Sequence, residues 1–118
     1  MQTTVATIPA DQITDWDSFH SVFQVALGFP DFYGRNMNAW IDCMTYIDDP
    51  TGGMTNIFVC PGDLLALRID DAPDFARRCP ELYQAIIECT AFVNYRRIER
   101  GDKPVLTLML NGWFKAPA

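Results

Sequence analysis

The chain has 118 residues, of which 49% are hydrophobic and 20% are charged, and its formal net charge is −6. This length and composition are typical of one folded domain, residues 1–118, and they exclude a disordered chain, which has fewer apolar residues and more charge. The negative charge disfavours direct binding to nucleic acid, because an acidic surface repels phosphates. It favours the encounter with a basic protein partner.

The cysteines and the N-terminal residues indicate a reducing compartment. None of the pairs among Cys43, Cys60, Cys79 and Cys89 has the CxxC spacing of a zinc site, and His20 completes no metal-binding set with them. The first ten residues have neither the basic start nor the apolar run of a secretory signal. No stretch approaches the roughly 20 apolar residues that span a bilayer. We therefore expect a cytoplasmic protein with free thiols, no metal, no cofactor and no contact with membranes.

The first quarter of the chain predicts a strand and a helix. Residues 3–8 are rich in β-branched side chains and are followed by proline, which is typical of a strand. Asp15 or Asp17 can cap a following helix, and Gly28 and Pro30 end it.

A tight connection, residues 31–36, precedes a second helix. Gly34 is expected to adopt a backbone conformation closed to other residues, and Asn36 is expected to cap the helix, which runs to about Ile47. Apolar side chains recur every three or four residues and should face the core: Met37, Trp40, Met44 and Ile47. Polar side chains then fall on the opposite face: Asn38, Asp42 and Thr45.

The second half of the chain predicts three more strands and two helices. Residues 56–60 look like a buried strand, and residues 64–69 look like a strand that pairs back with it as a hairpin. Residues 70–80 predict a short helix, residues 82–99 a long helix and residues 105–110 a buried strand. Strands separated by helices favour a two-layer α/β fold, in which a small, mainly parallel sheet packs against helices. The hairpin would add one antiparallel edge.

Four basic residues gather at the end of the long helix: Arg96, Arg97, Arg100 and Lys103. Positive charge there is favourable because it offsets the helix dipole. A phosphate-binding site is the weaker alternative.

The sequence contains none of the common catalytic motifs GxGxxG, GxxxxGK[ST], HExxH or GxSxG. His20 could act with Asp42 or Cys43 only if the fold brought them within hydrogen-bond reach. A structural histidine and an ordinary buried thiol are the favoured interpretations. We therefore expect that the chain is not an enzyme.

Two adjacent aromatic residues, Phe32 and Tyr33, lie in the connection directly before the second helix. Exposed aromatic rings near a carboxylate, here Asp42, are typical of protein-binding hot spots. Alternatively, both rings fold back onto the core at the entry of the helix. The residues alone leave both arrangements open.

Residues 27–45, LGFPDFYGRNMNAWIDCMT, resemble the barstar family of ribonuclease inhibitors. The positions that carry the resemblance are Pro30, Tyr33, Gly34, Asn36, Ala39, Asp42, Cys43 and Thr45. The order of strands and helices around this segment also agrees. The resemblance implies a small parallel sheet covered by helices, and a loop and second helix that plug the active site of a basic ribonuclease.

The resemblance also implies which residues bind: Phe32, Tyr33, Asn36, Asn38, Ile41, Asp42, Thr45 and Tyr46. Asp42 matches the carboxylate that enters the enzyme's phosphate-binding pocket, where it would replace a substrate phosphate among arginine and lysine side chains. We therefore expect an inhibitor or immunity protein whose partner is a basic ribonuclease or another toxin-like nuclease.

Three positions depart from the family pattern. Asn38 stands where the founding inhibitor has an acidic residue, Ile41 stands where it has tryptophan, and Arg96 falls near its second interface carboxylate. These changes reduce the match to a basic cleft, and a positive charge at the rim would repel the usual partner. The alternative is therefore an interaction module of the same fold whose partner is not a nuclease.

Overall fold

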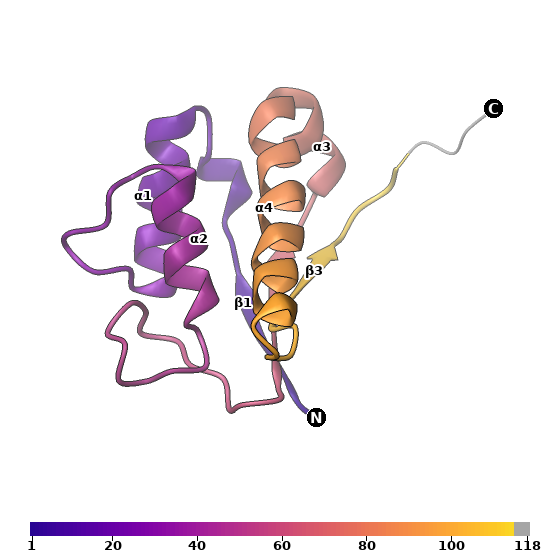
Figure 1. Cartoon of the computed structure of the whole chain (residues 1–118). Coiled ribbons are helices and arrows are strands. Elements are labelled where there is room, and N and C mark those ends of the chain that lie inside the picture. The colour runs from indigo at the N-terminus through magenta and orange to yellow at the C-terminus, as the bar shows by residue number, and fades with distance from the viewer. Residues whose placement is uncertain (115–118) are drawn as a thin grey trace.

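Residues 1–114 are described by a computed structural model of the chain, and Figure 1 shows the arrangement of its elements. In chain order these are β1 (Thr3–Thr7), the short 3-10 helix η1 (Ala10–Gln12), α1 (Trp16–Leu27), α2 (Met37–Thr45), β2 (Leu64–Ile69), α3 (Ala72–Arg78), α4 (Pro80–Glu99) and β3 (Leu106–Leu110). None of the helices in this part of the chain has the length and apolar composition that crossing a membrane requires.

The three strands form one parallel sheet in the order β1-β2-β3. Thr3 pairs with Leu64 at the start of the first ladder, and Leu65 pairs with Leu106 at the start of the second. Each connection between neighbouring strands contains helices, as parallel strands require. The predicted α/β class with a small parallel sheet is confirmed.

The predicted strand at residues 56–60 and its hairpin are wrong. The backbone N–H of Asn56 donates to the carbonyl of Leu27, and that of Val59 donates to the carbonyl of Ile47. The segment therefore satisfies carbonyl groups at the ends of α1 and α2 instead of joining the sheet. β2 has a parallel neighbour on each side, so the predicted antiparallel edge is absent from residues 1–114.

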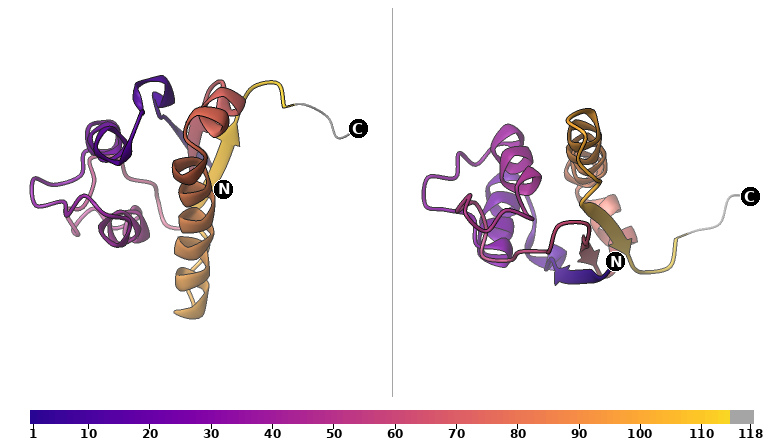
Figure 2. Two further views of the ribbon diagram at one scale, coloured as in Figure 1. Left: turned by 90° about the horizontal axis from the view of Figure 1, so that it is seen from above. Right: turned by 60° about the horizontal axis from the view of Figure 1, so that its bottom comes forward.

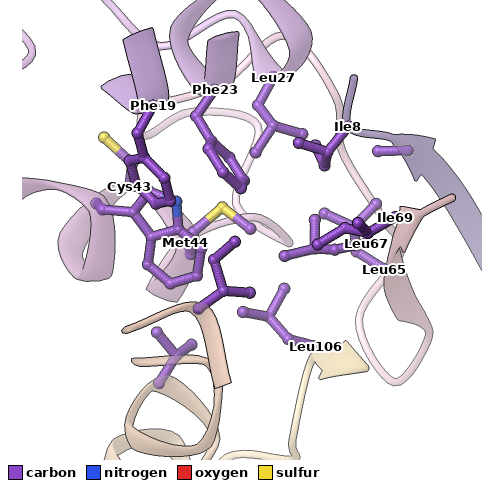
Figure 3. Close-up of a cluster of buried hydrophobic side chains, with 14 of the residues drawn as sticks. Ile8, Phe19, Phe23, Leu27, Cys43, Met44, Leu65, Leu67, Ile69 and Leu106 are labelled. Carbon is purple, nitrogen blue, oxygen red and sulfur yellow. The ribbon is translucent and has the colours of Figure 1, made fainter. Parts of the chain in front are cut away.

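The core lies between the sheet and the helices. Figure 2 shows α1, α2 and α4 on one side of the sheet. Alternate residues of β2, Leu65, Leu67 and Ile69, are fully buried, as the two-residue period of a strand predicts for its inner face. In Figure 3, Phe23 of α1 and Met44 of α2 point toward these side chains. Packing of the helices onto the sheet therefore fixes the position of α2.

The ends of α1 and α2 follow the predicted capping residues. Asp15, rather than Asp17, caps α1 by accepting a hydrogen bond from the backbone N–H of Ser18 at 2.9 Å. Gly28 ends α1 in the left-handed conformation, and a Cβ atom there would lie 2.4 Å from the Asn56 side chain. Asn36 caps α2 by accepting from the backbone N–H of Ala39 at 2.8 Å.

The backbone of the connection between α1 and α2 differs from the prediction at one residue. Arg35, not Gly34, adopts the left-handed conformation, with φ of 53°. Its guanidinium donates to the Asp17 carboxylate at 2.7 Å and to the Ser21 hydroxyl at 3.1 Å. These contacts with α1 compensate for the unfavourable conformation.

Candidate functional site

The two adjacent aromatic rings before α2 point in opposite directions. The side chain of Phe32 is 76% exposed, whereas Tyr33 is only 6% exposed. The Tyr33 ring packs against Phe29, with 4.8 Å between the ring centroids. Of the two arrangements that the sequence left open, Phe32 takes the exposed one and Tyr33 takes the buried one.

His20 fixes Tyr33 in place from α1. The Tyr33 hydroxyl lies 2.5 Å from Nδ1 of the buried His20. Burial lowers the pKa of His20, and the positive charge of Arg35 lowers it further, against the opposing effect of Asp17. Burial also raises the pKa of Tyr33. Both groups are therefore neutral at physiological pH, and a neutral imidazole can accept a hydrogen bond from the Tyr33 hydroxyl.

The polar residues of α2 divide between the surface and the core. Exposed positions are Asn36, Asn38, Asp42 and Tyr46. Ile41 is largely buried and Thr45 is fully buried, so the predicted outward orientation of Thr45 is wrong. The Thr45 hydroxyl donates to the carbonyl of Ile41 at 2.6 Å, which satisfies the polar group inside the helix.

Asp42 lies on the surface and has a partner within the chain. Its side chain is 53% exposed, and its Oδ1 accepts a hydrogen bond from Nη1 of Arg96 at 3.0 Å. Arg96 comes from α4 and is 38% exposed. Exposed pairs of this kind contribute only about 0–1 kcal/mol to folding. The carboxylate therefore remains accessible to a second protein.

A surface hollow of about 180 Å³ lies between the loop and α2. Its wall includes Phe32, Asp42, Cys43 and Met54, so an apolar surface stands next to a carboxylate. Burial, with a further contribution from Asp42, raises the pKa of the Cys43 thiol to about 11. The thiol is therefore protonated near neutral pH and is a poor nucleophile.

Two arginines of the basic run take part in contacts that the sequence did not reveal. Arg97 is buried and donates to both carboxylate oxygens of Asp48, at 3.0 and 2.7 Å. The guanidinium of Arg100 lies 5.5 Å from the ring centroid of Tyr46 and donates to Asp102 at 2.9 Å. Helix-dipole arguments predict cations at this helix end but do not indicate which carboxylate or ring each one contacts.

His20 and Asp42, which were considered for catalysis, are bonded to two different partners. His20 is bonded to Tyr33, and Asp42 is bonded to Arg96. Within residues 1–114, no group of three or more His, Cys, Asp and Glu side chains is arranged to hold a metal ion.

Taken together, the fold and the surface define a small α/β domain that presents an aromatic ring and a carboxylate side by side. The model of the family described as Barstar (barnase inhibitor) matches residues 3–109, and the chain therefore belongs to the barstar family. The comparison with curated proteins gives no match.

Proposed function

We propose that this chain binds a ribonuclease and blocks its active site. The family description names an inhibitor of barnase, which supports an inhibitory rather than a catalytic role. The observation that carries the proposal is the exposed Asp42 carboxylate beside the exposed ring of Phe32, with a hollow between them.

The proposed binding face consists of those residues implied by the family resemblance that are exposed: Phe32, Asn36, Asn38, Asp42 and Tyr46. Tyr33, Ile41 and Thr45, which the family resemblance also implies, are largely buried. We assign these three a supporting role, because they fix the loop and the helix from beneath.

In this proposal Asp42 replaces a phosphate of the substrate. Ribonuclease active sites use cationic side chains to bind phosphate. A carboxylate offers these cations a hydrogen-bond acceptor that is negatively charged, as the phosphate is. The attraction strengthens when the partner excludes water from the contact, since the local dielectric constant falls. Phe32 lines the same hollow as Asp42, and Tyr46 follows Asp42 by one helical turn, so these two exposed rings can supply the apolar contacts that exclude this water.

We also propose that the chain has no catalytic activity of its own and acts in the cytoplasm of the cell that makes the nuclease. The neutral Cys43 thiol and the His20–Tyr33 pair support structural roles for the candidate catalytic groups. Inhibition in the same compartment would protect the producing cell, as an immunity protein does.

Two features of the face favour a second candidate, an interaction module whose partner is not a nuclease. Arg96 already pairs with Asp42, and the neighbouring Asn38 adds no negative charge to the face. Both features weaken the attraction of this surface for a strongly basic cleft.

The test is to capture the native partner with tagged protein, separate the two, and assay the partner on RNA with and without the chain. We expect ribonuclease activity that disappears at equimolar chain. A stable complex whose partner never cleaves RNA would contradict the inhibitor proposal and favour the interaction module.

A further inference from the structure

The Asp42–Arg96 pair joins two elements that are fixed relative to each other. α2 packs against α4, and the next residue of α4, Arg97, bonds to Asp48 and to the carbonyl of Thr45 at the end of α2. Asp42 and Arg96 are therefore brought together by the fold before any partner binds, and the 3.0 Å contact is part of the surface that a partner meets.

A second charged pair lies beside the proposed binding face. Arg100 contacts the ring of Tyr46 and donates to the Asp102 carboxylate. The two carboxylates, Asp42 and Asp102, balance the two guanidinium groups of Arg96 and Arg100. These four side chains thus carry no net charge together, although the whole chain carries −6.

A uniformly basic cleft is a poor match for this arrangement. Its cations would have to compete with Arg96 for Asp42, and they would meet the positive charge of Arg96 at close range. A cleft that carries a carboxylate beside its cations would match both groups. Its cation would face Asp42, and its carboxylate would accept from the remaining N–H groups of Arg96, since a guanidinium has five donors.

We propose that the partner of this chain has an acidic side chain next to its cationic pocket, placed opposite Arg96, and that Arg96 selects against partners that lack it. This inference rests on the proposed function, because it concerns the same face. It assigns Arg96 a role in specificity in addition to its helix-dipole interaction.

The experiment uses barnase as the probe and measures its binding to four purified chains by titration calorimetry and inhibition of RNA cleavage. The chains are the wild type, Arg96→Glu, the double variant Asp42→Asn/Arg96→Glu, and Arg77→Glu. Arg77 is 74% exposed on α3 and pairs with Asp74, so its reversal changes the net charge equally but away from the face. Circular dichroism and urea unfolding verify that each variant is folded.

We expect Arg96→Glu to bind barnase at least about tenfold more tightly than the wild type, because the rim repulsion becomes an attraction. Arg77→Glu should change the affinity by less than about threefold, since exposed charges far from a contact are screened by salt. The double variant Asp42→Asn/Arg96→Glu should lose this gain in affinity for barnase.

The possible failures are distinguishable. If the wild type inhibits barnase and Arg96→Glu binds no more tightly, the selectivity inference is overturned and the proposed function stands. Equal gains in Arg96→Glu and Arg77→Glu would also overturn it, because the effect would then come from net charge. If neither the wild type nor Arg96→Glu binds barnase, the inference is overturned, and inhibition of barnase-class ribonucleases is contradicted with it.

Discussion

Arg97 and Asp48 form an almost buried ion pair, in which the guanidinium donates to both carboxylate oxygens. The same guanidinium donates to the carbonyls of Thr45 and Lys103. One side chain of α4 therefore satisfies backbone carbonyl groups at the end of α2 and in the loop that leads into β3. This contact determines where Asp42 and Arg96 meet.

Replacement of Arg97 by alanine should destabilise the fold strongly. It leaves Asp48 without its partner in a largely buried position, and losses of this kind cost about 3–5 kcal/mol. Urea unfolding measures the change in free energy. Arg77→Ala, which removes an exposed pair, should cost less than about 1 kcal/mol. A loss in Arg97→Ala no larger than in Arg77→Ala would show that the buried pair does not hold the two helix ends together.

The stability of the protein should decrease as the pH falls below the pKa of an unfolded histidine, about 6.5. The folded-state pKa of His20 is lowered, mainly by burial, so the unfolded chain binds the proton more readily. The stabilisation is fully present above pH 6.5 and is lost as the pH falls from there through the folded-state pKa. Urea midpoints measured from about pH 7.5 to about pH 5.5 cover this window.

His20→Asn is the matched control for the pH dependence. It keeps an acceptor for the Tyr33 hydroxyl but does not titrate, and the chain has no other histidine. We expect a flatter dependence between these pH values. The same slope in His20→Asn and the wild type would contradict the assignment to His20.

Local patterns predicted most of the fold. The caps at Asp15 and Asn36, the helical spacing in α2 and the predicted strands at residues 64–69 and 105–110 all depend on neighbouring residues, and the structure has these elements close to the expected positions. The prediction at residues 56–60 failed because an apolar run determines neither its own burial nor the partner of its backbone. Of these residues only Val59 is buried, and Cys60 is exposed. There the hydrogen bonds go to the ends of α1 and α2, which are distant in sequence.

Phe32 and Tyr33 should separate binding from stability. Phe32→Ala should weaken binding to the nuclease by about 2 kcal/mol, the usual loss at a hot spot, with a change of less than about 0.5 kcal/mol in unfolding. Tyr33→Ala should instead destabilise the fold by about 3–5 kcal/mol, as other deletions of buried aromatic rings do. Calorimetric titration and urea unfolding measure the two effects. Normal binding by a folded Phe32→Ala variant would exclude Phe32 from the binding face.

The four thiols should react at very different rates with a thiol reagent such as DTNB. Cys60 is exposed, whereas Cys43 and Cys79 are buried, and burial raises the pKa of Cys43 to about 11. We expect Cys60 to react first in the native protein and Cys43 to react only after unfolding. Mass spectrometry of the labelled peptides identifies the sites. Rapid native labelling of Cys43 would contradict the closed packing of α2 on the core.

The candidate site was less predictable than the fold, for a specific reason. Helical spacing placed Asp42 on the surface correctly but also placed Thr45 there, since a helical period cannot anticipate that a hydroxyl will bond to the carbonyl of Ile41 inside its own helix. The contact between Asp42 and Arg96 joins residues 54 positions apart, so it depends on the packing of α2 against α4.

The most direct test of the proposed function is the affinity of Asp42→Asn for the captured nuclease, compared with the wild type and with Asp11→Asn. Asp11 is exposed on η1, so its replacement makes the same change in net charge outside the binding face. We predict that Asp42→Asn loses at least about 100-fold in affinity and no longer inhibits RNA cleavage at equimolar amounts, while Asp11→Asn behaves as the wild type. Wild-type inhibition by a folded Asp42→Asn variant would contradict the claim that this carboxylate occupies the phosphate pocket.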